Sequence, residues 1–137
     1  MRTIASFACV VAALGIVAAG QARAEVYACQ VRQSWSLNDS GDLELYGSKI
    51  YVGDRFTVDG ETGEVKGEED LSIWKGPWKV AETGGKNQSL ILMSYYLSDT
   101  RPLHILSVMT WTERPEMSFS HYHLGTATIL TGLCRVR

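Results

Sequence analysis

The sequence predicts an all-β domain, an antiparallel meander that closes into a small barrel or a strongly curled sheet. Apolar and polar residues alternate with a period of two through most of the chain after residue 25, as in strands with one buried face. Short turns rich in Gly, Asn and Asp separate these stretches. The second half has no room for the long crossovers that parallel strands require. A two-sheet β-sandwich is the alternative architecture.

The first half predicts short strands joined by glycine-containing turns. Strands are expected over 26–35, 43–46, 49–52, 56–58 and 64–67. In the first of these, alternate residues from Tyr27 through Cys29 to Trp35 form one mostly apolar face. Residues 59–63 contain two glycines and join two strands as a hairpin. Residues 68–74 fit either one helical turn preceded by acids or an irregular loop.

The second half predicts longer strands, rich in Thr, Val, Ile, Tyr and Trp, which suit a pleated surface. They are expected over 78–82, 89–97, 103–112, 117–124 and 126–135. If successive strands are neighbours, a closed or strongly curled sheet brings the first strand beside the last.

Two of these strands, 89–97 and 103–111, are apolar on both faces. An antiparallel strand with one solvated face alternates more cleanly than this. We therefore expect the outer face of the sheet to be covered by the 71–74 segment, by a second copy in a homodimer, or by a ligand.

The first 24 residues predict a cleavable signal peptide. Arg2 precedes an apolar run from Ile4 to Ala19, and Ala22-Arg23-Ala24 supplies the small residues of a cleavage site. The run is shorter than the ~20 apolar residues of a spanning helix, and no later stretch is long enough. Residues 25–137, roughly 113 residues, then form one β domain of ordinary size. We expect a periplasmic or secreted protein.

The charge balance argues against a nucleic-acid partner. Removal of Arg2 and Arg23 leaves 11 of the 13 basic residues against 15 acidic ones, a net charge of about −4. The basic residues are scattered along the sequence. A mildly acidic domain of this kind has no electrostatic footprint for nucleic acid or anionic lipid.

Two cysteines, Cys29 and Cys134, remain after removal of the signal peptide, one near each end of the domain. In an oxidising compartment such a pair usually forms a disulfide. This predicted bridge and the predicted meander imply the same geometry, in which the first and last strands are adjacent.

Three short motifs mark the two ends and one hairpin of the domain. They are Tyr27-Ala28-Cys29, a Phe-x-x-Asp-x-x-Thr-Gly pattern from Phe56 to Gly63, and the closing Gly132-Leu133-Cys134. Through them the chain resembles a group of small exported bacterial proteins of unassigned function. The resemblance implies an exported β-domain and no particular activity.

Gly76-Pro77-Trp78 is similar to the Gly-x-Trp signature of lipocalins, in which the Trp closes one end of the barrel. Lipocalins carry it on the first strand, whereas here it lies in the middle of the chain. The alternative is that Trp78 simply packs in the core.

The most site-like pattern lies on the strand predicted over 117–124. Met117, Phe119, His121 and His123 occupy alternate positions and so share one face. Two histidines at i and i+2 can share a metal ion, and a nearby thioether favours copper. A zinc site requires three or four protein ligands, and only His104 remains as a third histidine.

No catalytic motif is present: there is no Gly-x-Ser-x-Gly, no phosphate loop and no His-Glu-x-x-His. The sequence therefore predicts a non-enzymatic, exported β-domain without a cofactor that binds a protein partner or a small apolar ligand. The alternative is a periplasmic copper- or zinc-binding protein that uses His121 and His123, with Met117 as a further ligand.

Overall fold

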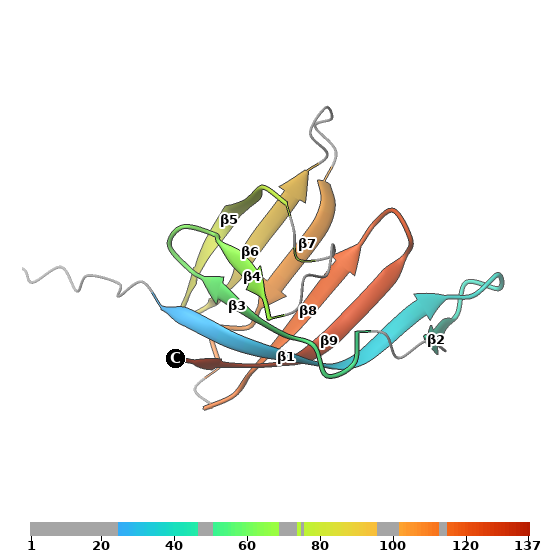
Figure 1. Ribbon diagram of the computed structural model, residues 1–137, viewed down its shortest axis with the longest axis horizontal. Coiled ribbons are helices and arrows are strands. Elements are labelled where there is room, and N and C mark those ends of the chain that lie inside the picture. Colours follow the sequence, from blue (N-terminus) through green and yellow to red (C-terminus); the bar gives the residue numbers. More distant parts are fainter. Residues whose placement is uncertain (1–24, 47–50, 69–73, 75, 96–101, 113–114) are drawn as a thin grey trace, which may run out of the picture.

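The computed structural model describes residues 25–46, 51–68, 74, 76–95, 102–112 and 115–137. These residues form one antiparallel sheet of nine strands, curled into a half-barrel (Figure 1). The strands are β1 Val26–Leu37, β2 Leu43–Leu45, β3 Arg55–Asp59, β4 Val65–Gly67, β5 Trp78–Gly85, β6 Gln88–Tyr95, β7 Pro102–Val108, β8 Met117–His123 and β9 Thr128–Val136. The prediction of an all-β, strongly curled antiparallel sheet is confirmed.

The strand order is β4-β3-β1-β9-β8-β7-β6-β5, and β2 pairs with the second half of β1. Strands β5 to β9 form the predicted meander. The chain ends then meet, because β1 pairs with β9 along most of its length. Cys29 lies directly opposite Cys134 in this pairing, and their sulfurs form a disulfide with a Cα–Cα distance of 4.0 Å.

Several predicted boundaries differ from the structure. Tyr51 and Val52, expected in a strand, belong to a turn. The strand expected to reach Thr112 ends at Val108, where Thr110 and Trp111 turn the chain. The predicted signal peptide, residues 47–50, and most of the ambiguous 68–74 segment lie outside the described residues.

The side chains on the concave, inner face of the sheet form the core. Phe56 of β3 stacks on Trp74, with ring centroids 4.0 Å apart, and meets Phe119 of β8 edge to face at 5.1 Å. Leu90, Leu92, Leu106, Val108 and Leu130 are fully buried. Strands β3 and β4 therefore fold over the sheet and cover its inner face from one side.

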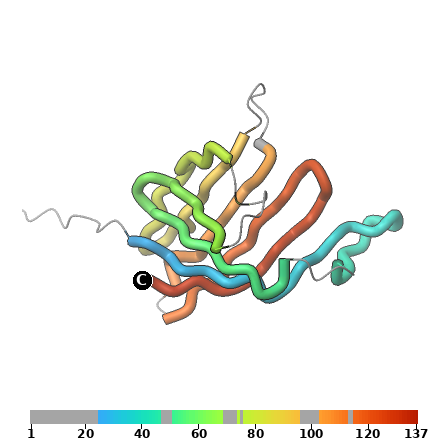
Figure 2. The backbone as a smooth tube through the Cα atoms, viewed as in Figure 1, coloured from blue at the N-terminus to red at the C-terminus, as the bar shows by residue number. Residues whose placement is uncertain are grey.

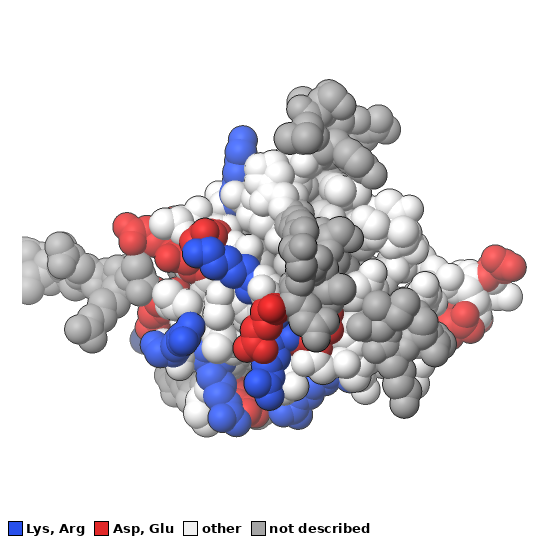
Figure 3. All heavy atoms as spheres, in the orientation of Figure 1, with Lys and Arg blue, Asp and Glu red and all other residues white. Residues whose placement is uncertain are grey.

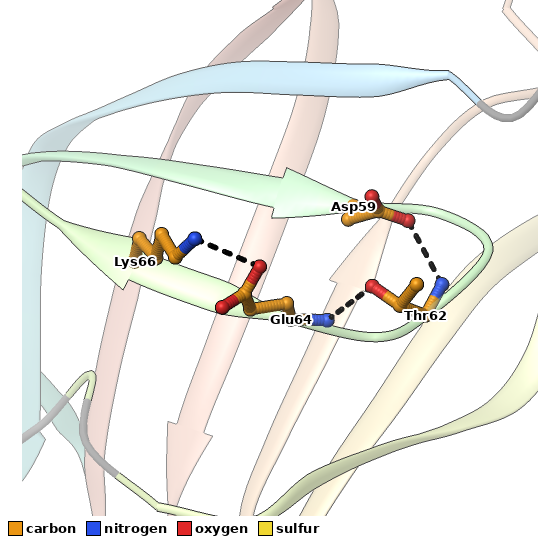
Figure 4. Close-up of polar contacts among 4 residues, drawn as sticks. All are labelled: Asp59, Thr62, Glu64 and Lys66. Atoms are coloured by element: carbon orange, nitrogen blue, oxygen red, sulfur yellow. Dashed lines mark hydrogen bonds and ion pairs between the residues drawn. The ribbon is translucent and has the colours of Figure 1, made fainter.

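The β3–β4 turn is fixed by a side chain (Figure 4). Asp59 Oδ1 accepts a hydrogen bond of 2.8 Å from the backbone N–H group of Thr62, drawn in Figure 4, and one of 2.9 Å from the N–H group of Glu61. These bonds, Thr62 first, hold the pKa of Asp59 below its usual value. Gly63 has φ 75°, and a Cβ there would lie 3.0 Å from the Val80 side chain of β5. The β3–β4 turn therefore lies close to β5, the strand at the opposite edge of the half-barrel.

Figure 2 shows the other notable feature, the end of β1 that projects away from the body together with β2. We call residues 33–46 the arm. Within it Trp35 pairs with Leu45 and Leu37 with Leu43.

Candidate functional site

The inner face gathers the three histidines. The pairing of β7 with β8 places His104 opposite His123 and Leu106 opposite His121. Met117, Phe119 and His121 are buried and His123 is partly buried, so the four alternate residues of β8 share the inner face as predicted. The sequence pattern thus placed these side chains on one face correctly. It did not show which residues of other strands contact them.

His104 and His121 are in direct contact. His104 Nδ1 lies 3.1 Å from His121 Nε2, and His123 stacks on His104 with ring centroids 4.5 Å apart. His104 lies on β7, whereas His121 and His123 lie on β8. The register between these two strands therefore decides that His104 contacts them.

Two tryptophans enclose the histidine pair. The Trp74 ring lies 5.2 Å from that of His121, and the Trp78 ring lies 5.7 Å from His104 and 6.0 Å from His121. Trp78 Nε1 donates a hydrogen bond of 3.1 Å to the carbonyl of Trp74, which fixes the two indoles relative to each other. Trp78 is 8% exposed. Its alternative interpretation as a core residue is therefore confirmed.

Burial keeps this cluster neutral. Desolvation, with smaller contributions from the other histidines, lowers the pKa of His121 to about 3. Desolvation and the nearby His123 lower the pKa of His104 to about 4. His121 Nδ1 has no hydrogen-bond partner among the described residues. Since an orphaned buried N–H is rarer than an orphaned acceptor, we assign the proton to His121 Nε2, which donates to His104 Nδ1.

The donor set differs from the one predicted for a metal ion. Met117 is four residues from His121 along an extended strand, about 13 Å away, and lies opposite Cys134. His123 Nδ1 is hydrogen-bonded to Thr126 Oγ1, and its Nε2 faces Gly125. Two nitrogens, those of His104 and His121, remain side by side. In the part of the chain that the structure describes, no three His, Cys, Asp or Glu residues are arranged to hold a metal ion.

Acid is expected to destabilise the domain through His104 and His121. Their folded pKa values lie below the usual 6.5, so the unfolded chain binds protons first as the pH falls. Above about pH 6.5 the free energy of unfolding contains the full contribution of these two histidines. Below that pH it decreases toward pH 4, by up to about 1.4 kcal/mol per pH unit for each histidine. Urea unfolding at pH 7.5, 6 and 5 measures this slope. A His104→Gln, His121→Leu variant should show a smaller slope, and equal slopes would contradict the assignment.

The outer face carries an apolar stripe that runs across six strands. By register, Met93 pairs with Ile105, Ile105 with Tyr122, Tyr122 with Ile129, Ile129 with Trp35, and Trp35 with Leu45. Tyr122 is 39% and Leu45 62% exposed, and the others are partly buried. Of the 71–74 segment expected to cover this face, the described residue, Trp74, lies against the inner face.

A groove lies beside this stripe, nearer the disulfide end of the outer face. It has a volume of about 1100 Å³ and is lined by Trp111, Thr112, Pro115, Glu116, Ser118, Leu133 and Arg135. A smaller hollow of about 360 Å³ adjoins it and adds Arg32 and Arg55. Arg135 forms an ion pair with Glu116, which holds the pKa of Glu116 below its usual value.

The sequence did not predict this grouping of arginines. Arg32, Arg55 and Arg135 are far apart along the chain, and only the pairing of β3, β1 and β9 brings them together. The sequence contained one indication of the face on which such side chains lie. Residues next to Cys29 and Cys134 along their strands must point to the face opposite a buried disulfide.

None of the described residues forms a helix of the length and apolarity needed to cross a bilayer. The resemblance to small exported bacterial proteins stays a prediction that rests on its three motifs. Neither protein-family models, nor curated proteins, nor solved structures give a match to this chain.

Proposed function

We propose that this chain is an exported, non-enzymatic domain that binds a partner protein through the outer face of its half-barrel. The observation that carries the proposal is the apolar stripe from Met93 to Leu45, which includes side chains up to 62% exposed. Large contiguous apolar patches on a soluble domain mark interaction sites. Tyr and Trp residues, here Tyr122 and Trp35, supply much of the binding energy at such sites.

A protein partner has more support than a small apolar ligand held inside the half-barrel. The inner-face residues Phe56, Leu90, Leu92, Leu106 and Phe119 are at most 2% exposed and pack against one another. The accessible apolar side chains of the stripe lie on the outside, and they form a long strip rather than a pocket. Such a strip suits an extended protein surface.

Export is supported by the disulfide. The Cys29–Cys134 bridge joins buried positions at the two ends of the domain, and bridges of this kind persist in oxidising compartments. The predicted signal peptide over residues 1–24 agrees with this. We infer a periplasmic or secreted location.

Site-specific photocrosslinking in cells that export the protein tests the proposal. A photoreactive phenylalanine replaces Tyr122, and the matched control places it at Glu61, an exposed residue of the β3–β4 turn. We expect one discrete adduct from position 122 and none from position 61. The adduct should weaken at least tenfold when Leu45→Lys is added, because Lys interrupts the stripe. Identical products from both positions would refute the proposal.

A second candidate function is copper or zinc binding by the histidine pair. One observation favours it: once the His121 proton moves from Nε2 to the unpartnered Nδ1, His104 Nδ1 and His121 Nε2 both have free lone pairs, and their separation of 3.1 Å is near the roughly 3.3 Å between two nitrogens on a tetrahedral ion. Calorimetric titration of Zn²⁺ and Cu²⁺ at pH 7.5 is the test. Binding should be lost in His104→Ala and in His121→Ala and kept in His123→Ala. If His121→Ala binds as well as the parent, this candidate is eliminated.

A further inference from the structure

The arm concentrates exposed leucines. Leu37, Leu43 and Leu45 are 50%, 54% and 62% exposed, and the register places all three, with Trp35, on the outer face of the β1–β2 hairpin. Leucines that keep half or more of their surface exposed on a two-stranded hairpin gain only part of their full burial energy in the isolated domain. They indicate a surface that is buried against another molecule.

The turn at the tip of the arm is formed by hydrogen bonds within the arm itself. Asn38 Oδ1 accepts hydrogen bonds from the N–H groups of Ser40 and Asp42, at 3.0 and 2.9 Å, and Gly41 has φ 85°. Ser34 accepts a backbone bond from Tyr46 at 2.8 Å. A preorganised element loses little conformational entropy on binding, which favours its use as a docking element.

The charge of the arm is one-sided. Residues 33–46 contain Asp39, Asp42 and Glu44 and no Lys or Arg. In Figure 3 the charged side chains drawn at the end of the molecule where Figure 1 places β2 are acidic, whereas basic and acidic side chains intermix over the body of the molecule. The arm is thus an acidic, leucine-rich projection.

The groove on the outer face is its complement in polarity and charge. It is a hollow of about 1100 Å³, whose wall includes Trp111, 48% exposed, and Leu133. Arg32, Arg55 and Arg135 line it and the adjoining hollow, against the single acid Glu116 among their lining residues. Opposite charges that meet across an interface steer association and set its orientation.

One molecule cannot join its own arm to its own groove. The base of the arm, Gln33 to Ser36, is part of β1 and is paired with β9. The hollow lies along Ala28, Gln30 and Arg32 of the same strand. A paired strand cannot fold back on itself, so the two surfaces can meet only between molecules.

We propose that the partner is a second copy of this chain, whose arm occupies the groove of its neighbour in a head-to-tail contact. The inference rests on the proposed function, since it names the protein that the outer face binds. A head-to-tail contact leaves one arm and one groove free in each dimer, so assembly continues until a ring closes or a chain forms.

Complementation between two variants tests the contact. The arm variant is Leu43→Ser, Leu45→Ser, and the groove variant is Trp111→Ala, Arg32→Ala. Sedimentation velocity at about 100 μM should show association of the parent, and each variant alone should dissociate at least tenfold more readily. An equimolar mixture of the two should form dimers and nothing larger, because only one intact arm–groove contact is available. A Leu124→Ser, Val136→Ser variant loses equally exposed side chains elsewhere and should associate like the parent.

Salt and thermal melting complete the test. Because arginines and carboxylates face each other, 0.5 M NaCl should weaken association several-fold, and unchanged melting temperatures should show that both variants are folded. The inference is overturned if the parent is monomeric, if the mixture stays monomeric, or if the groove variant associates like the parent through arm–arm contacts. A monomeric parent with a foreign protein crosslinked at position 122 would overturn this inference alone, and the proposed function would stand.

Discussion

Removal of the disulfide is expected to lower the free energy of unfolding by about 3–5 kcal/mol. The bridge closes a loop with a sequence separation of 105 residues, so it removes many conformations from the unfolded chain. The loss would be a large fraction of the roughly 5–15 kcal/mol that holds a domain of this size folded. Urea unfolding of the oxidised and reduced protein, followed by tryptophan fluorescence, measures the difference.

The control separates the cross-link from the packing of its sulfurs. Cys29 and Cys134 are 4% and 0% exposed, so a Cys29→Ala, Cys134→Ala variant also loses core volume. The reduced parent keeps both sulfur atoms and lacks only the covalent bond. If reduced and oxidised protein unfold at the same urea concentration, the bridge does not contribute to stability.

Gly132→Ala is expected to destabilise the domain by about 3 kcal/mol or more, the upper end of the range for overpacked cores. A Cβ at Gly132 would overlap the Gln30 carbonyl oxygen of β1 and lie 2.6 Å from Phe119 Cε1. The carbonyl belongs to the paired β1 backbone and cannot move without loss of the β1–β9 pairing. Thermal unfolding monitored by circular dichroism gives the change.

Gly125→Ala is the matched control, because a Cβ there would meet its nearest neighbours at 3.6 Å, an ordinary contact. We expect a change within about 0.5 kcal/mol. If the two substitutions cost the same, the proposed overlap at Gly132 does not occur. The steric requirement also gives a physical reason for the glycine of the closing Gly132-Leu133-Cys134 motif.

The strands were predictable where a residue's environment is set by its own neighbours. The alternation around Cys29 and around His121 correctly assigned the inner face, because side chains alternate whatever the partner strand is. The prediction was wrong for Trp35, which the β-bulge between Val31 and Gln33 shifts to the outer face, opposite Ile129. Ends of strands were less predictable. Val108 ends β7 although Met109 and Trp111 continue an apolar pattern, since the local sequence does not show where strand pairing stops.

In the candidate sites, too, some features followed from a single strand and others depended on the pairing of strands. The shared face of His121 and His123 followed from the sequence, but the contact between His104 and His121 depends on the register between β7 and β8. The groove is a stronger case, because Arg32, Arg55 and Arg135 meet through strands that are distant in sequence. Hydropathy and spacing carry no information on such register-dependent contacts.

By itself, then, the sequence determined many local features of this protein: most of its strands and turns, the shared face of alternate residues around Cys29 and His121, and the pair of cysteines available for a bridge. Only the tertiary structure decided which face stays uncovered, which histidines touch, and where leucines and arginines gather into surfaces. The physical reason is that side-chain alternation is a property of one strand, whereas an interaction surface is built by the pairing of several strands.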